Sequence, residues 1–380
     1  MRILRQVANS ILRSGLSLLK DAPPAAKERA VRSIVRILAP LDFPLIQERT
    51  PEALLGAVRI MAEAVATTPY GEPLRYPTPL VITVGSTTSC PFPCANCYSN
   101  STDASSHSAQ HAGPRLFQRI AASAAPFVMI GGGEPLATPN IGGLVQLLLD
   151  AGKVVYFATN ASLTPLIDQI ARHKGQLVPF LSVWGAREEH DRQRGRGSYD
   201  RLARNLENLN GVDARGNLLV VLSSSDLSIF DTVADLVSKT SVRTVLVTRK
   251  LFAGRTAGGP FNPSPQVLRN ILERIRSIQP HVVQVSVDIP ELSALKLRRP
   301  PLLQRLLGIP AATECGAGNW TMHLDSAGQG YPCFSLETSQ ELGIGADLEI
   351  ADQWKKVVRL RRTLGSSSPC LGERAIVSEA

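Results

Sequence analysis

Aromatic residues, cysteines and long apolar runs are all scarce in this chain. Of its 380 residues only 5% are aromatic and six are cysteine. No run approaches the ~18 apolar residues of a spanning helix, so no transmembrane segment is expected. Because nucleic-acid binding uses basic surfaces interleaved with aromatic side chains, no nucleic-acid partner is expected either. Six cysteines without a signal-peptide-like apolar stretch do not fit a secreted disulfide scaffold. We therefore expect a cytoplasmic protein whose cysteines serve metal binding or catalysis.

The positive charge is concentrated near the N-terminus. The net charge is +9, and residues 1–40 hold eight basic residues against Asp21 and Glu28, which is +6 of that total. Residues 1–20 contain no acidic residue, and apolar positions recur on one side of a helix, at Ile3, Leu4, Val7, Ile11 and Leu18. Three interpretations stay open: a helix packed on the domain, an organelle-targeting segment, or a membrane-surface helix that would give peripheral membrane contact through residues 1–20.

The pattern along the chain predicts three regions. Hydrophobic residues make up 44% of the chain, enough for a large core. Residues 1–75 read as a helical extension that ends in a proline-rich linker. Residues 76–300 alternate short apolar strands with helices, which predicts an α/β fold, a partial (β/α)6 TIM-like barrel with chemistry at the carboxyl ends of its strands. The expected strands are 80–84, 127–130, 154–158, 180–183, 218–222, 242–247 and, as a seventh, 282–287. Residues 301–380 predict a small appended domain that ends in a helix over 350–364.

Three cysteines lie within one span of eight residues after the first expected strand. Cys90, Cys94 and Cys97 can converge on one metal centre from a single loop. Three protein thiolates on a cubane cluster leave one iron open to bind and polarise another molecule, as an open coordination position does in catalytic metal sites. The spacing therefore favours a catalytic iron–sulfur site over three incidental buried thiols.

This loop resembles the defining motif of the radical S-adenosylmethionine (radical SAM) superfamily, CxxxCxxC followed by an aromatic residue. Tyr98 supplies the aromatic residue, and Gly131-Gly132-Gly133-Glu134-Pro135 after the next strand resembles that family's GGEP motif. Glycines allow backbone to approach a ligand closely, and a carboxylate with nearby carbonyls can accept hydrogen bonds from an ammonium group. The resemblance implies a SAM-binding 4Fe–4S cluster on Cys90, Cys94 and Cys97, with Tyr98, Gly132, Gly133 and Glu134 as SAM-site residues.

Two later segments extend the resemblance. Thr159-Asn160-Ala161 is similar to the family's TNG, and residues 181–199 resemble a serine- and arginine-containing segment of the SPASM/twitch branch. By this resemblance Asn160, Ser182 and Arg194 are SAM-site residues, since an arginine fork suits a carboxylate. Trp184 stands where the family usually has Asp, which implies a different pocket wall.

The remaining three cysteines form a second set near the C-terminus. Cys315, Cys333 and Cys370, with a glycine-containing hairpin around Asp325, resemble the auxiliary-cluster domain of twitch proteins. The resemblance implies a second, auxiliary 4Fe–4S cluster. Glu373 stands where those domains usually place a fourth cysteine, and carboxylate suits such a cluster less well than thiolate. An open fourth position, another ligand, or a Cys370 that does not bind iron are the alternatives.

The resemblance implies reductive cleavage of SAM to a 5'-deoxyadenosyl radical that abstracts a hydrogen atom from substrate. If all six cysteines bind iron, no thiol remains as a hydrogen donor, so we expect an oxidation of a small polar, sugar- or aminocyclitol-like metabolite, with the auxiliary cluster as electron acceptor. A reducing partner such as flavodoxin or ferredoxin is implied. The alternatives are an epimerase with Cys370 as hydrogen donor, a peptide-modifying maturase, a membrane-lipid-modifying enzyme, and a non-catalytic iron–sulfur protein.

Overall fold

The computed structural model describes most of the chain between residues 51 and 364. The described residues are 23, 51–69, 72, 74–103, 109–162, 166–214, 216–250, 253–256, 261–282, 284–289, 315–337 and 340–364. Three predictions lie outside these residues: the basic helix of residues 1–20, Cys370 as a cluster ligand, and the alternative ligand Glu373.

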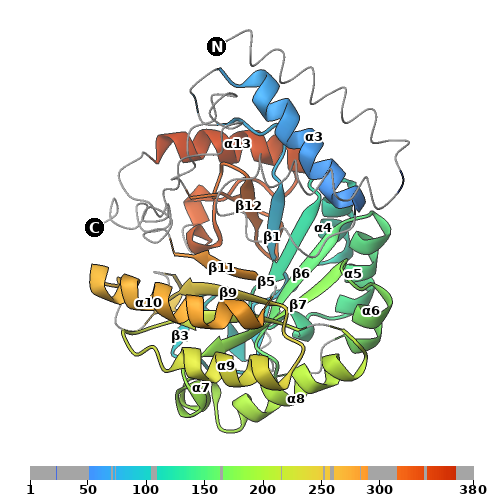
Figure 1. Cartoon of the computed structure of the whole chain (residues 1–380). Helices are drawn as coiled ribbons and strands as arrows, with labels where there is room; N and C mark the ends of the chain where they lie inside the picture. The colour runs from blue at the N-terminus through green and yellow to red at the C-terminus, as the bar shows by residue number, and fades with distance from the viewer. Residues whose placement is uncertain are drawn as a thin grey trace.

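A nine-stranded sheet forms the centre of the molecule, in the order β11-β9-β8-β7-β6-β5-β1-β12-β13 (Figure 1). All neighbouring strands are parallel except β12 and β13, and the described edge strands β11 and β13 do not pair with each other. The sheet is therefore an open, partial barrel, which confirms the predicted fold class. Its strands are β1 Val81–Gly85, β5 Phe127–Gly131, β6 Val154–Thr159, β7 Leu177–Trp184, β8 Asn217–Leu222, β9 Thr244–Arg249, β11 Gln284–Asp288, β12 Thr321–Leu324 and β13 Gly330–Tyr331.

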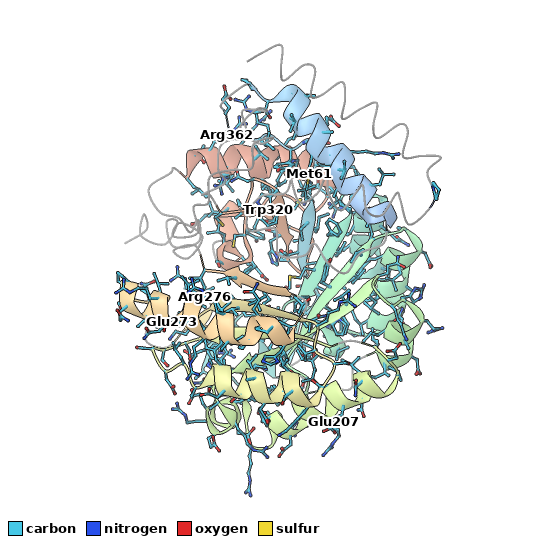
Figure 2. All side chains as sticks on the ribbon, viewed as in Figure 1. Met61, Glu207, Glu273, Arg276, Trp320 and Arg362 are labelled. Carbon is cyan, nitrogen blue, oxygen red and sulfur yellow. The ribbon has the colours of Figure 1, made fainter. Side chains whose placement is uncertain are left out.

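Helices cover the outer face of this curved sheet (Figure 1). Helix α10, for example, turns an apolar stripe inward: it starts at Pro265 after the capping residue Ser264 and buries Leu268, Ile271 and Ile275 at helical spacing. Figure 2 shows the contrast between the buried Met61 of α3 and the exposed Glu207 and Glu273. The helices are α3 Pro51–Thr67, α4 Pro114–Ala122, α5 Ile141–Asp150, α6 Ile167–Arg172, α7 Arg187–Arg194, α8 Ser198–Gly211, α9 Ile229–Lys239, α10 Pro265–Ile278 and α13 Ile350–Thr363.

Aromatic side chains fill the inner face of the sheet on one side of the site. The ring of Tyr156 lies between Phe127 and Phe180, with centroid distances of 6.4 and 6.1 Å, and all three side chains are buried. Toward the carboxyl ends of the strands the inner face becomes polar, at Thr83 and Ser182. The packed aromatic layer thus leaves the carboxyl end as the place for chemistry.

The C-terminal segment joins the central sheet directly. Strand β12 runs parallel to β1, with Thr83 opposite His323, and β13 turns back antiparallel to β12, which confirms the predicted hairpin. Helix α13 packs over it, and Trp354 donates its indole N–H to the Tyr76 carbonyl at 2.9 Å. The sequence pattern predicts an appended domain over residues 301–380, whereas in the structure β12 extends the core sheet.

Candidate active site

The loop that carries Cys90, Cys94 and Cys97, called the cysteine loop, follows β1. Two short strand pairs hold it. Strand β2 (Ser89–Cys90) pairs with β4 (Thr102–Asp103), and β3 (Asn96–Cys97) pairs with β10 (Arg255–Thr256). Gly254 precedes β10 with φ +57°, and a Cβ atom there would lie 2.3 Å from the Cys97 carbonyl oxygen. Only glycine allows this close approach, so backbone pairing on both sides fixes the loop.

The glycine motif after β5 grips the chain that leads into Cys90. Gly133 donates its N–H to the Thr87 carbonyl at 2.7 Å, and Glu134 donates its N–H to the Ser89 carbonyl at 2.8 Å. A Cβ atom on Gly133 would lie 2.1 Å from the Ser89 oxygen. Gly132, at φ +112°, donates its N–H to the Tyr98 hydroxyl at 3.1 Å. The motif therefore positions the cysteine loop through its own backbone.

The Glu134 carboxylate is wholly buried and bound by the neighbouring turn. It accepts hydrogen bonds from the Thr159 hydroxyl at 2.7 Å, from the Asn160 N–H at 2.8 Å and from the Leu136 N–H at 3.2 Å. Burial raises the pKa of Glu134, and these hydrogen bonds act against the rise. A contact between Glu134 and the SAM ammonium group stays a prediction; what the geometry establishes is a link between the glycine motif and Asn160.

The three thiols have different surroundings. Cys90 is buried and accepts hydrogen bonds from the Asn160 side-chain amide at 3.3 Å and from the Phe92 N–H at 3.5 Å. Burial raises its pKa to about 12. Burial is also the largest effect on Cys97, but hydrogen bonds from Ser99 and Ser101 together lower the pKa of that thiol. Burial raises the pKa of Cys94, while the charge of Arg194 acts against that rise.

A buried guanidinium lies beside these thiols. Arg194, at the end of α7, donates to the Ser182 carbonyl at 2.7 Å, and no described carboxylate forms an ion pair with it. Burial lowers its pKa, and Cys94, Glu134 and Cys90 raise it, in that order. A buried cation needs anionic partners. Trp184, at the end of β7, also keeps an indole N–H with no described partner.

These residues fit a cluster with a bound carboxylate ligand. No His, Cys, Asp or Glu group among the described residues is arranged to hold a single metal ion, whereas a cluster spreads its thiolate ligands over several irons. The charge of Arg194 suits thiolates together with the carboxylate of an amino acid such as SAM. The predicted residues Cys90, Cys94, Cys97, Asn160 and Arg194 thus share one neighbourhood.

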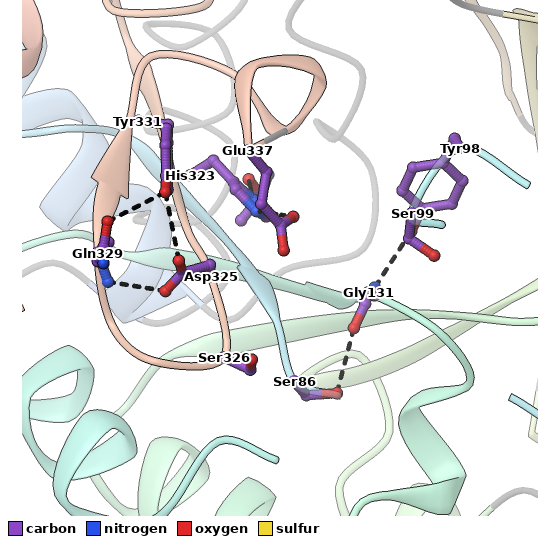
Figure 3. Close-up of polar contacts among 12 residues, drawn as sticks. Ser86, Tyr98, Ser99, Gly131, His323, Asp325, Ser326, Gln329, Tyr331 and Glu337 are labelled. Atoms are coloured by element: carbon purple, nitrogen blue, oxygen red, sulfur yellow. Dashed lines mark hydrogen bonds and ion pairs between the residues drawn. The ribbon is translucent and has the colours of Figure 1, made fainter. Parts of the chain in front are cut away.

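A polar group that sequence analysis misses lies on the inner face beside Tyr98. His323 of β12 contacts the Thr83 hydroxyl at 2.8 Å through Nδ1 and the Glu337 carboxylate at 3.1 Å through Nε2. The ring of Phe334 contacts Tyr98 at 5.2 Å and His323 at 6.3 Å between centroids. Figure 3 shows Glu337 between His323 and Tyr98. A single histidine between Met322 and Leu324 gives no sequence signal, because the pairing depends on β12 lying beside β1.

The two described cysteines of the second set, Cys315 and Cys333, lie in the same part of the structure. Cys315 and Cys333 both pack against the small apolar cluster of Ala317, Tyr331 and Leu336. The hairpin between them holds Asp325, which accepts the Gln329 N–H at 2.8 Å. Binding of an auxiliary cluster by Cys315, Cys333 and Cys370 stays a prediction, because Cys370 lies outside the described residues.

Comparison with known proteins agrees with this geometry. The family model of the Radical SAM superfamily matches residues 84–236, which include the cysteine loop, the glycine motif and Arg194. Over these residues the chain is similar to the Radical SAM superfamily. This similarity supports a 4Fe–4S cluster and SAM as its cofactors.

Two curated relatives have enzyme names. The chain is 29% identical over 150 residues to an AdoMet-dependent heme synthase of Methanosarcina barkeri, covering 37% of this chain and 42% of that protein. It is 26% identical over 268 residues to the mycofactocin maturase MftC of Mycolicibacterium smegmatis, covering 67% of this chain and 64% of that protein. The chain therefore spans less than two thirds of the length of either relative.

Solved structures share the fold. Streptococcus suis SuiB bound to precursor peptide SuiA superposes with a TM-score of 0.61 at 16% identity, covering 82% of this chain and 72% of SuiB. Native anSMEcpe with bound AdoMet superposes with a TM-score of 0.56 at 17% identity, covering 76% and 84% of the two chains. At such low identity these similarities establish the fold alone.

Proposed function

We propose that this chain is a radical SAM enzyme that abstracts a hydrogen atom from a small polar metabolite and completes an oxidation. The observation that carries the proposal is the cysteine loop, whose three thiols lie at the carboxyl end of the sheet beside the buried guanidinium of Arg194. When bound, the cluster and SAM supply the radical that removes the hydrogen atom. The protein's part is to bind, orient and exclude water.

The SAM-site residues have distinct roles in this proposal. Arg194 binds the SAM carboxylate, because its fork can donate two parallel hydrogen bonds and its charge has no described ion-pair partner. Carbonyl groups of the glycine motif accept hydrogen bonds from the SAM ammonium group. Tyr98 orients that motif through the Gly132 N–H. Ser182 acts through the carbonyl oxygen that holds Arg194 in place.

The polar group on the inner face supports the proposed substrate class. His323 and Glu337 are 3.1 Å apart, and Glu337 is the more exposed of the two side chains, at 28% against 5%. The pair can accept the proton of a substrate hydroxyl group. In an alcohol oxidation this pair would take up the hydroxyl proton. SAM with its cluster would accept the hydrogen atom from the carbon, and an auxiliary cluster would accept the remaining electron, so that a carbonyl product balances the step.

Peptide maturation is the second candidate. SuiB, solved with its precursor peptide SuiA, and MftC, named as a maturase, both resemble this chain. The polar inner face at His323 and Glu337 would suit a peptide substrate as well. Against it, residues 1–75 carry no sequence signal for the hairpin with which many such enzymes grip a leader peptide.

Anaerobic reconstitution tests the proposal. Reconstituted wild type with dithionite and SAM is expected to release 5'-deoxyadenosine, and a Cys90→Ala, Cys94→Ala, Cys97→Ala triple variant is expected to release none. Release should increase when a pool of sugars and aminocyclitols is added, and a peptide pool serves as the comparison. Absence of 5'-deoxyadenosine from wild type that holds iron and sulfide would overturn the assignment as a radical SAM enzyme.

The reaction type has its own test. Cys370→Ala is expected to lower iron and sulfide per chain and to abolish the oxidised product. Unchanged cluster content together with lost product would overturn the oxidation and favour an epimerase that uses the Cys370 thiol as its hydrogen donor.

A further inference from the structure

The side chain of Asn160 contacts one of the three cluster cysteines. Its Nδ2 amino group donates to the Cys90 Sγ atom at 3.3 Å. Cys90 is the most buried of the three thiols, at 7% exposure. In such a low-dielectric position a hydrogen bond has a larger electrostatic effect than it has at the surface.

The orientation of the Asn160 amide is fixed by its other partners. Its Oδ1 atom accepts the Ser162 N–H at 2.8 Å, so the amide oxygen cannot exchange places with the nitrogen. The backbone N–H of Asn160 donates to Glu134 Oε2 at 2.8 Å. With the oxygen turned toward one backbone donor, the amino group must face Cys90.

The turn that carries Asn160 is held in an uncommon conformation. Ala161 has φ +60°, in the left-handed region that favours glycine, and it is buried. Its N–H donates to the Thr159 hydroxyl at 3.0 Å, and its carbonyl accepts the Asn205 amide at 3.0 Å. Such strain persists only where the surroundings impose it, and it is typical of functional sites.

We propose that Asn160 sets the reduction potential of the iron–sulfur cluster through its hydrogen bond to Cys90. This inference rests on the proposed function, because it requires the cluster to be bound by Cys90, Cys94 and Cys97. Reduction adds negative charge that spreads onto the ligand sulfurs, and a donor at a sulfur stabilises the reduced form. Asn160 therefore makes the cluster easier to reduce.

The other two thiols have different compensating groups. Cys97 accepts from the Ser101 N–H and contacts the Ser99 hydroxyl, both at 3.4 Å. Cys94 lies in the field of Arg194. Among the described residues, Asn160 is the single side chain that donates to Cys90, and the other donor is the Phe92 backbone N–H. No other described side chain can therefore replace Asn160 when its amide is removed.

Two near-isosteric variants test the proposal. Asn160→Leu removes the donor, and Asn160→Asp also places a negative charge beside the sulfur while keeping an acceptor for the Ser162 N–H. Reconstituted, SAM-free proteins are titrated anaerobically with the reduced cluster followed by EPR, and iron and sulfide are counted per chain. We expect the potential to become more negative in both variants, with the larger shift in Asn160→Asp. Ser162→Ala is the matched control, because it keeps the backbone N–H, and its potential should equal that of wild type.

Each other outcome decides against the proposal. Unchanged potentials at normal iron content would overturn it. Weaker SAM binding with an unchanged SAM-free potential would make Asn160 a SAM contact only. Loss of iron from both variants but not from Ser162→Ala would give Asn160 a purely structural role. A wild type that binds no cluster would instead overturn the proposed function.

Discussion

At the scale of single residues, His190 shows how burial fixes a protonation state. Its side chain is fully buried, Nδ1 accepts the Trp184 backbone N–H at 3.2 Å, and its ring contacts that of Tyr199 edge-on at 5.9 Å. Burial, and then the charge of Arg194, lower the pKa of His190 to about 3, with Asp191 acting in the opposite direction. The imidazole is therefore neutral in the folded protein at neutral pH.

This depressed pKa predicts a loss of stability in acid. The unfolded chain binds a proton at His190 below a pH of about 6.5, whereas the folded protein does so only near pH 3. Stability is therefore lost as the pH falls between these values, at up to about 1.4 kcal/mol per pH unit. His190→Phe removes this contribution, so urea unfolding at several pH values should show a shallower acid slope than wild type.

The same series contains its own control. At pH 8 neither state of wild type carries a proton on His190, so the difference between the two proteins there reports packing and the lost Trp184 hydrogen bond alone. Parallel pH profiles of wild type and variant between pH 6.5 and 4 would contradict the prediction.

At the scale of elements, α8 depends on a cap from the preceding helix. Asp191 of α7 accepts hydrogen bonds from the Gly197 N–H at 2.7 Å, the Ser198 hydroxyl at 3.0 Å and the Tyr199 N–H at 2.8 Å. These groups include N–H donors that an α-helix leaves unpaired at its first turn. Asp191 therefore joins α7, which carries Arg194, to α8.

Removing this cap should destabilise the protein measurably. Asp191→Ala is expected to lower the free energy of unfolding by about 1–2 kcal/mol, the usual cost of losing a cap. Chemical denaturation measures it, with Glu188→Ala on the exposed side of α7 as the control. Equal stability of the two variants would show that water replaces the carboxylate.

The strands of the barrel were largely predictable because their signal is local. The expected strand 127–130 and the observed β5, Phe127–Gly131, differ by one residue. Strand β7 starts at Leu177, earlier than the predicted residue 180, and contains Pro179. A proline interrupts the apolar pattern that predicts a strand. In the structure the Asn217 side-chain amide donates to the Pro179 carbonyl at 3.1 Å across the strand pair. Such a cross-strand contact cannot be predicted from one segment.

At the scale of the whole molecule, the C-terminal segment is part of the core. Gln353 of α13 is fully buried, donates to the carbonyls of Gly328 and Gly345 at 2.9 Å each, and accepts from Arg119 of α4 at 3.0 Å. Because β12 pairs with β1, these contacts join α13 to the same sheet that carries the cysteine loop. We infer that the C-terminal segment and the barrel unfold together.

Gln353→Ala tests this coupling. The change leaves buried carbonyls and one arginine donor without their partner, at a cost of about 2–4 kcal/mol. A single unfolding transition should shift as a whole, whether followed by circular dichroism or by tryptophan fluorescence. Lys356→Ala, on the exposed side of the same helix, should leave the transition unchanged. Two separate transitions in Gln353→Ala would mean that the segment folds independently.

The candidate site was predictable to the extent that its residues cluster in sequence. Cys90, Cys94 and Cys97 lie within eight consecutive residues of one loop, so their spacing alone indicates a metal centre. His323, which pairs with Glu337, contacts Thr83 only because a strand some 240 residues away in sequence lies beside β1. Without that topology nothing distinguishes this histidine from any other buried histidine.

The buried charge of Arg194 links maturation of the protein to its folding. Before iron is bound, burial raises the pKa of Cys90 to about 12 and raises that of Cys94, so both thiols hold protons near neutral pH. Arg194 then lacks thiolate counter-charge. Iron binding requires thiolates, so a cluster bound at the proposed site would supply this missing negative charge. Binding of the cluster would therefore also stabilise the fold.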